Sequence, residues 1–122
     1  MGVGVDAVDV ARFRRLLDRR PRFAARCFTE TEQSDAGGSG DPAQSLAARF
    51  AAKEAGAKAL GTGIQHGVTW KELEVRRLPG HRPNLFFSGR AQEIATQLGV
   101  RHISLSLTHS TTTAMAAVHL EN

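Results

Sequence analysis

The sequence has a single cysteine, Cys27, among 122 residues, which excludes an internal disulfide and is typical of proteins in the reducing cytoplasm. No apolar run approaches the ~20 residues that a membrane-spanning helix needs, and no targeting signal is recognisable at the N-terminus. Four histidines lack any metal-ligand spacing with the cysteine or a carboxylate: His66, His81, His102 and His119. We therefore expect a cytoplasmic protein with no membrane anchor and no zinc site.

Acidic residues are the scarcer charged type, with 12 Asp and Glu against 16 Lys and Arg, which gives a net charge of +4. The excess is concentrated in residues 12–26, where seven arginines accompany Asp18 as the only acid. Such a run is usually a solvated helix face, but this imbalance favours a surface that binds an acidic partner. Nucleic acid is disfavoured as that partner because the segment has no regular aromatic interleaving and no known reading motif.

The length predicts a single domain over residues 1–122. Hydrophobic periodicity and turn residues predict strands at 2–8, 70–77, 84–88 and in a closing hairpin over 103–121. They predict helices at 10–20, at 42–60 and at 89–98, with Asp9, Asp41 and Ser88 as their N-caps. Thr29 and Glu32 have the spacing of a capping box for a further short helix. The order indicates an α+β fold with a mostly antiparallel sheet, a long central helix and duplicated strand–helix–hairpin units.

The helix expected at 42–60 carries the most informative charges. Lys53 falls inside its apolar stripe, where an ammonium is costly unless an anionic or hydrated group meets it. Glu54 lies at the edge of that stripe, one turn before Lys58. The structural alternative is that Lys53 extends its charge to solvent and that Glu54 and Lys58 form an ordinary surface pair.

Two other residues could carry chemistry. Asp6 lies on a strand beside Gly4, where a carboxylate suits a hard cation such as magnesium, although it could simply cap the first helix. His109 continues an apolar strand face and could act as a general base, bind phosphate, or form a hydrogen bond at the strand end. The segment Gly61-Thr62-Gly63 is first of all a helix stop, with amides that could bind an anion.

Three segments together resemble the holo-acyl-carrier-protein synthase family of 4'-phosphopantetheinyl transferases: GVGVDAVDVARF at 2–13, LAARFAAKEAGAKALGTGI at 46–64 and ISLSLTHSTTTAMAAVHLE at 103–121. The resemblance implies the transferase fold and transfer of the phosphopantetheine arm of coenzyme A to a serine of an apo acyl carrier protein. It also implies a homotrimer with sites at the subunit interfaces. The alternative is a non-catalytic basic module that binds an acidic protein or nucleic acid.

The resemblance also implies roles for individual residues. Magnesium would be held by Asp6 and Glu54. Chemistry and position, in contrast, make Glu54 the first candidate for the catalytic base and His109 the second, and Lys58 is expected as a further catalytic residue. The coenzyme would be bound by Arg49, Phe50, Lys53, Lys58, Gly61, Thr62, Gly63, Arg82, Pro83 and His109. The acidic carrier would meet Arg12, Arg15 and Arg19. His81 interrupts the family's usual pattern in the turn at 79–83, which weakens the expectation for nucleotide contacts there.

Overall fold

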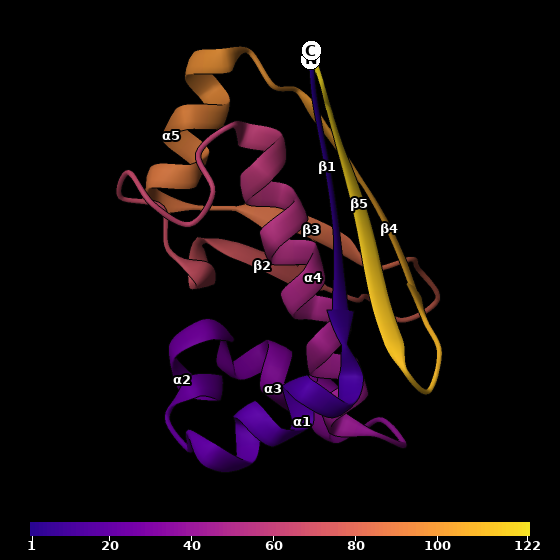
Figure 1. The fold of residues 1–122 in the computed structure, drawn as a ribbon. Coiled ribbons are helices and arrows are strands. Elements are labelled where there is room, and N and C mark those ends of the chain that lie inside the picture. The colour runs from indigo at the N-terminus through magenta and orange to yellow at the C-terminus, as the bar shows by residue number, and fades with distance from the viewer.

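The computed structural model describes residues 1–122 and consists of two small antiparallel sheets around one long helix (Figure 1). One sheet has the order β1-β5-β4, from Gly2–Asp9, Thr113–Glu121 and His102–His109. The other pairs β2, Leu73–Arg76, with β3, Asn84–Phe87. Helix α4, Pro42–Leu60, packs against both sheets, and the expected α+β architecture is confirmed.

The remaining helices cover the two ends of α4. Helices α1, Val10–Arg19, α2, Phe23–Cys27, and α3, Glu30–Gly37, gather around its N-terminal half, whereas α5, Gly89–Leu98, lies beside its C-terminal half (Figure 1). A helix followed by an antiparallel strand pair occurs twice, as α4-β2-β3 and as α5-β4-β5, which matches the expected duplication. None of these helices combines the length and apolar composition that a membrane-spanning segment requires.

Local sequence signals set most helix ends. The Asp9 side chain accepts a hydrogen bond from the Arg12 amide, and the Asp41 side chain accepts one from the Gln44 amide. Thr29 and Glu32 form the predicted capping box at α3. Gly61 ends α4 with φ of 85°, a left-handed conformation that glycine adopts without strain.

Two expectations about local structure were wrong. Residues 70–72, expected in a strand, form a 3-10 helix, Trp70–Glu72, and the strand begins only at Leu73. Ser88 precedes α5 but its side chain makes no capping hydrogen bond. Instead, Glu72 Oε2 accepts a hydrogen bond from the Arg90 amide at 2.7 Å, while Glu72 Oε1 accepts one from the Thr69 amide. One carboxylate therefore caps both the 3-10 helix and α5, and it takes the place expected for Ser88 at the Arg90 amide.

Candidate active site

Strand β1 and helix α4 approach so closely that only glycine fits between them. A Cβ atom on Gly4 would lie 1.8 Å from the carbonyl oxygen of Ala55, and one on Gly2 would lie 2.3 Å from that of Ala59. Asp6 follows on the same face of β1, and Glu54 precedes Ala55 on α4. The two glycines thus bring a strand carboxylate and a helix carboxylate to one place.

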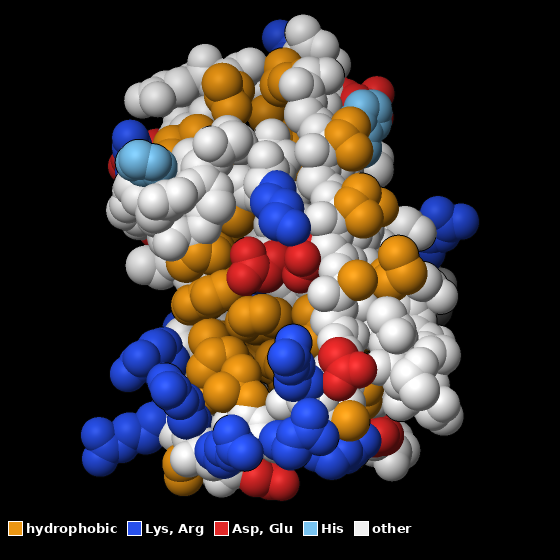
Figure 2. Space-filling model, in the orientation of Figure 1, with side chains coloured by type: hydrophobic (Ala, Val, Ile, Leu, Met, Phe, Trp, Pro, Cys, Tyr) orange, Lys and Arg blue, Asp and Glu red, His pale blue; other side chains and the backbone are white.

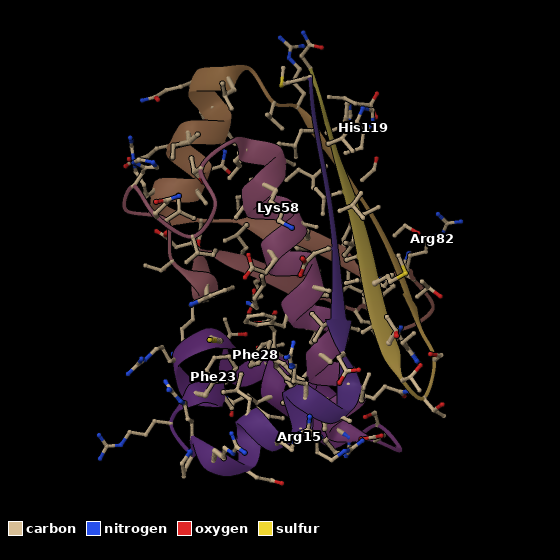
Figure 3. All side chains as sticks on the ribbon, in the orientation of Figure 1. Arg15, Phe23, Phe28, Lys58, Arg82 and His119 are labelled. Atoms are coloured by element: carbon tan, nitrogen blue, oxygen red, sulfur yellow. The ribbon has the colours of Figure 1, made fainter.

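Asp6, Glu54 and Lys58 form a charged cluster at this contact. Lys58 Nζ donates to Asp6 Oδ1 at 3.0 Å and to the carbonyl oxygen of Val5 at 3.2 Å. Partial burial raises the pKa of the Glu54 carboxyl, the neighbouring Asp6 charge raises it further, and Lys58 lowers it. Figure 2 shows acidic side chains next to a lysine at the centre of this face, where Figure 3 labels Lys58. Glu54 therefore interacts with Asp6 through space, although only Asp6 is bonded to the lysine.

The donors of this cluster fit a hard divalent cation. A carboxyl group whose pKa is raised by burial and by a neighbouring carboxylate, as that of Glu54 is by Asp6, gains from a cation between the two. No group of three His, Cys, Asp or Glu side chains could hold a metal anywhere in the chain. The protein therefore offers two carboxylates, and a six-coordinate ion would draw its other ligands from water, from a bound substrate or from a second subunit.

A groove of about 700 Å³ begins at Asp6 and runs along α1. Its apolar floor includes Phe13, Leu16 and Phe50. Phe50 is half-buried and stacks on Trp70 with ring centroids 4.7 Å apart. The rim is basic and includes Arg12, Arg15, Arg19 and Arg20. Figure 2 shows this apolar area between the acidic side chains and a band of lysine and arginine side chains. We call it the α1 groove.

A second groove, of about 780 Å³, lies between the N-terminal half of α4 and strand β4, and we call it the β4 groove. Its basic lining residues come from distant parts of the sequence and outnumber the acids Asp35 and Asp41: they are Arg49, Arg77, Arg82 and His109, with Pro83 beside them. Arg49 is only 9% exposed and forms no ion pair. Its Nη1 donates to Ser45, but its Nε has no hydrogen-bond partner, and burial lowers its pKa. The charges of Asp35 and Glu32 raise this pKa in part, but neither residue forms a salt bridge with Arg49. A buried guanidinium that is not paired directly favours binding of an anion.

The two grooves have no lining residue in common, so the predicted site residues that line a groove fall into two groups, while Glu54 and Lys58 line neither groove. The α1 groove is lined by Asp6, Phe50 and the α1 arginines. The β4 groove is lined by Arg49, Arg82, Pro83 and His109. Figure 3 shows Lys58 beside β1, at one edge of the three-stranded sheet, and Arg82 near β4, at the other edge.

Lys53 was expected to bind the coenzyme, and the structure contradicts this. Its side chain has no solvent exposure, and Nζ donates to Glu32 Oε1 at 2.7 Å and to the carbonyl oxygens of Trp70 and Leu73 at 3.0 and 2.7 Å. All three ammonium protons are therefore used inside the protein. Glu32, which the sequence marked only as a cap, is the missed partner. The signal was Lys53 itself, because a lysine in an apolar stripe requires an acidic partner.

The backbone amides of Gly61, Thr62 and Gly63 do not form the expected anion site. The Gly61 amide donates to the carbonyl oxygen of Lys58 at 2.9 Å, and the Thr62 and Gly63 amides donate to that of Ala57 at 3.2 and 3.1 Å. These amides cap the end of α4, so they have no free proton for a ligand. A Cβ atom on Gly61 would meet nothing within 4 Å, so the space beside this residue is free of protein atoms.

Comparison with known proteins identifies the family of this chain. Residues 2–117 match the 4'-phosphopantetheinyl transferase superfamily. The holo-acyl-carrier-protein synthase of Koribacter versatilis is 42% identical over 123 aligned positions, which cover 100% of this chain and 98% of the relative. The synthase of Neisseria meningitidis has a crystal structure that superimposes with a TM-score of 0.88 at 35% identity, over 99% of this chain and 98% of that one.

A second solved structure adds a ligand. The synthase of Bacillus anthracis, in complex with CoA (3',5'-ADP), superimposes with a TM-score of 0.80 at 35% identity, over 98% of this chain and 94% of that one. The similarity extends over the whole fold and includes all three segments that carried the resemblance. The expectation of an enzyme is therefore confirmed over the alternative of a non-catalytic basic module. The chain belongs to the 4'-phosphopantetheinyl transferase superfamily, and within it to the holo-acyl-carrier-protein synthases.

Proposed function

We propose that Asp6 and Glu54 hold a magnesium ion in this holo-acyl-carrier-protein synthase, which transfers the 4'-phosphopantetheine group of coenzyme A to a serine of an apo acyl carrier protein. The proposal rests chiefly on one observation. Gly4 lets β1 and α4 touch, so that Asp6 raises the pKa of the Glu54 carboxyl at the end of an open groove. A divalent ion relieves the repulsion between these carboxylates.

The transfer forms a bond from the serine oxygen to the phosphorus that carries the pantetheine arm. It breaks the bond from that phosphorus to the neighbouring diphosphate oxygen, and 3',5'-ADP leaves. When bound, magnesium neutralises charge that develops on the diphosphate, which supplies several kcal/mol of transition-state stabilisation. The serine proton needs an acceptor. Glu54 is the first candidate, because burial and the charge of Asp6 raise the pKa of its carboxyl group.

The β4 groove supplies the remaining contacts to phosphate in this proposal. Arg49 forms no salt bridge there, and Arg82 and His109 line the same groove with Pro83. Charge-assisted contacts of this kind contribute about 1.5–3 kcal/mol each. His109 is the second candidate for the base, and its removal would leave a pH–rate profile unchanged if it only binds phosphate. Lys58 remains a candidate for a phosphate contact because its side chain is half exposed.

We also propose that the protein acts as a homotrimer of single-domain chains, with each site formed between two subunits. The two grooves share no lining residue within one chain, and in this arrangement the α1 groove of one subunit lies next to the β4 groove of its neighbour. A surface for that contact exists on the outer face of the β1-β5-β4 sheet, where Val3, Val5 and Met115 are exposed. Apolar side chains gathered on one sheet face are typical of an interface between subunits.

The acidic carrier protein is proposed to dock on the α1 groove. Arg12, Arg15 and Arg19 lie on its rim, next to Asp6. This arrangement would bring the carrier serine to the carboxylates while arginines bind the acidic side chains around it. A cytoplasmic location is proposed as well, because the only cysteine, Cys27, is buried and unpaired.

The test is to weigh an apo acyl carrier protein after incubation with the enzyme, coenzyme A and magnesium. A mass gain equal to one phosphopantetheine group is expected, and EDTA should abolish it. Asp6→Asn and Glu54→Gln should each reduce the rate by at least about 100-fold. Glu93→Gln, at an exposed position on α5, is the matched control and should retain the wild-type rate. Full activity of both carboxylate variants, or full activity in EDTA, would refute the proposed metal site.

A further inference from the structure

Lys58 is the only side chain that forms a hydrogen bond with Asp6. Its Nζ lies 3.0 Å from Asp6 Oδ1 and 3.2 Å from the carbonyl oxygen of Val5, so both acceptors belong to β1. The ion pair bridges the gap between α4 and β1, and Figure 3 shows the lysine side chain on this side of the helix. One cation of the chain therefore already binds the carboxylate that the proposed function assigns to a metal.

The two members of this pair differ in mobility. The Lys58 side chain is 50% exposed, whereas that of Asp6 is 20% exposed. Asp6 is part of a strand paired on one side with β5 and packed on α4 through Gly4, so its position is fixed. Lys58 has a flexible four-carbon stem and can turn its ammonium towards solvent or a ligand without moving the helix.

We propose, on the basis of the proposed function, that Lys58 competes with the divalent cation for Asp6 and that the coenzyme relieves this competition by binding the ammonium. In the free enzyme the ammonium charge weakens binding of the metal. A bound diphosphate offers the ammonium several charged oxygens in exchange for one carboxylate oxygen and one carbonyl. Metal and coenzyme then increase each other's affinity, because the metal releases Lys58 from Asp6 so that it can bind the diphosphate, and the diphosphate draws Lys58 away from the metal site.

The size of the effect follows from the exposure of the pair. A positive charge a few ångströms from a divalent ion, at a half-exposed position, changes metal affinity by about five-fold. By linkage, the gain in coenzyme affinity that metal produces should shrink by the same factor when the charge is removed. A lysine that merely supports the fold would not change the affinity of the free protein for metal in this direction.

The experiment measures binding of Mn²⁺ alone to the free protein by electron paramagnetic resonance, with no coenzyme present. The variants are Lys58→Gln, which removes the charge, and Lys58→Arg, which keeps it. We expect Lys58→Gln to bind Mn²⁺ about five-fold more tightly than the wild type and Lys58→Arg to bind it equally. Calorimetric titration of coenzyme A, with and without metal, should then show a smaller effect of metal in Lys58→Gln. Circular dichroism checks that the variants are folded.

Each outcome has one meaning. Equal or weaker Mn²⁺ binding by Lys58→Gln overturns the competition while leaving the metal site intact, provided that Asp6→Asn still reduces Mn²⁺ binding. If Asp6→Asn leaves Mn²⁺ binding unchanged, the proposed metal site itself is wrong and the competition is refuted with it. Tighter binding by Lys58→Gln together with loss of binding by Asp6→Asn supports both.

Discussion

Lys53 and Glu32 form a fully buried ion pair, in which Nζ lies 2.7 Å from Oε1 and neither side chain is exposed to solvent. Glu32 Oε2 also accepts the amide proton of Val75, and the lysine binds the carbonyl oxygens of Trp70 and Leu73. One pair of side chains thus ties α3, α4 and β2 together. Because Lys53 points into this junction, the next residue, Glu54, lies on a different side of α4, where β1 packs.

Removal of either member of this pair should cost about 3–5 kcal/mol in the free energy of unfolding, because the other charge stays buried without a partner. Lys53→Met and Glu32→Gln test this by chemical denaturation. The double variant should lose less than the sum of the two single variants, which identifies the pair as the cause. Lys71→Met, at an exposed position, is the control and should change stability by less than about 0.5 kcal/mol.

Gly4→Ala should disrupt both the fold and the site. The new Cβ would lie 1.8 Å from the Ala55 carbonyl oxygen, and backbone atoms cannot yield as a flexible side chain would. β1 must then move away from α4 and take Asp6 with it. Gly37→Ala is the control, because no atom lies within 4 Å of its added methyl group and the residue lines neither groove. Wild-type activity and melting temperature in Gly4→Ala would contradict the close approach described for these two elements.

Local patterns were enough to predict most of the secondary structure. The limits of α4 follow from Asp41, Pro42 and Gly61, and the capping box of α3 follows from two residues three positions apart. Such signals act between neighbours in the sequence. The cap of α5 was missed for the same reason, because Glu72 lies 18 positions before the amide of Arg90 that it binds.

The site was predictable in its residue types and not in its geometry. Asp6 and Glu54 were expected together, and Glu54 responds to the charge of Asp6 in the structure. Lys53 precedes Glu54 in the sequence and was expected in the coenzyme site, yet its partner Glu32 lies 21 positions earlier and draws it into the core. The separation of the α1 groove from the β4 groove depends on how α4, β4 and the segment at 77–83 pack. No local pattern encodes that packing.

The thiol of Cys27 should be unreactive in the native protein. Burial raises the pKa of this thiol to about 11 from its ordinary value of 9.0, and the residue has no solvent exposure. At pH 8 the thiol therefore keeps its proton and is shielded as well. Ellman's reagent should give no signal until the protein unfolds in denaturant. Because the unfolded chain loses this proton at lower pH than the folded chain, stability should fall as the pH rises from about 9 to about 11.

Reversal of charge on α1 should weaken binding of the carrier and leave binding of the coenzyme unchanged. The variant Arg12→Glu/Arg15→Glu places two acids on the rim of the α1 groove, where they repel an acidic partner. The KM for the carrier protein should rise on the order of ten-fold or more, while the KM for coenzyme A stays within about two-fold. Arg101→Glu alters an exposed arginine outside both grooves and controls for net charge. An equal rise in both Michaelis constants would rule out this role.

Two inactive variants should restore activity to each other if each site combines groups from two subunits. Glu54→Gln impairs the carboxylate pair, and Arg49→Ala removes the buried guanidinium of the β4 groove. In trimers that form at random from an equal mixture, about a quarter of the interfaces would combine an intact Glu54 from one chain with an intact Arg49 from its neighbour. The two proteins, unfolded and refolded together, should thus recover about a quarter of the wild-type activity per site. Each variant refolded alone gives the baseline. If both groups serve a site within one chain, every site in the mixture carries one defect, and activity stays at that baseline even though mass spectrometry shows mixed trimers.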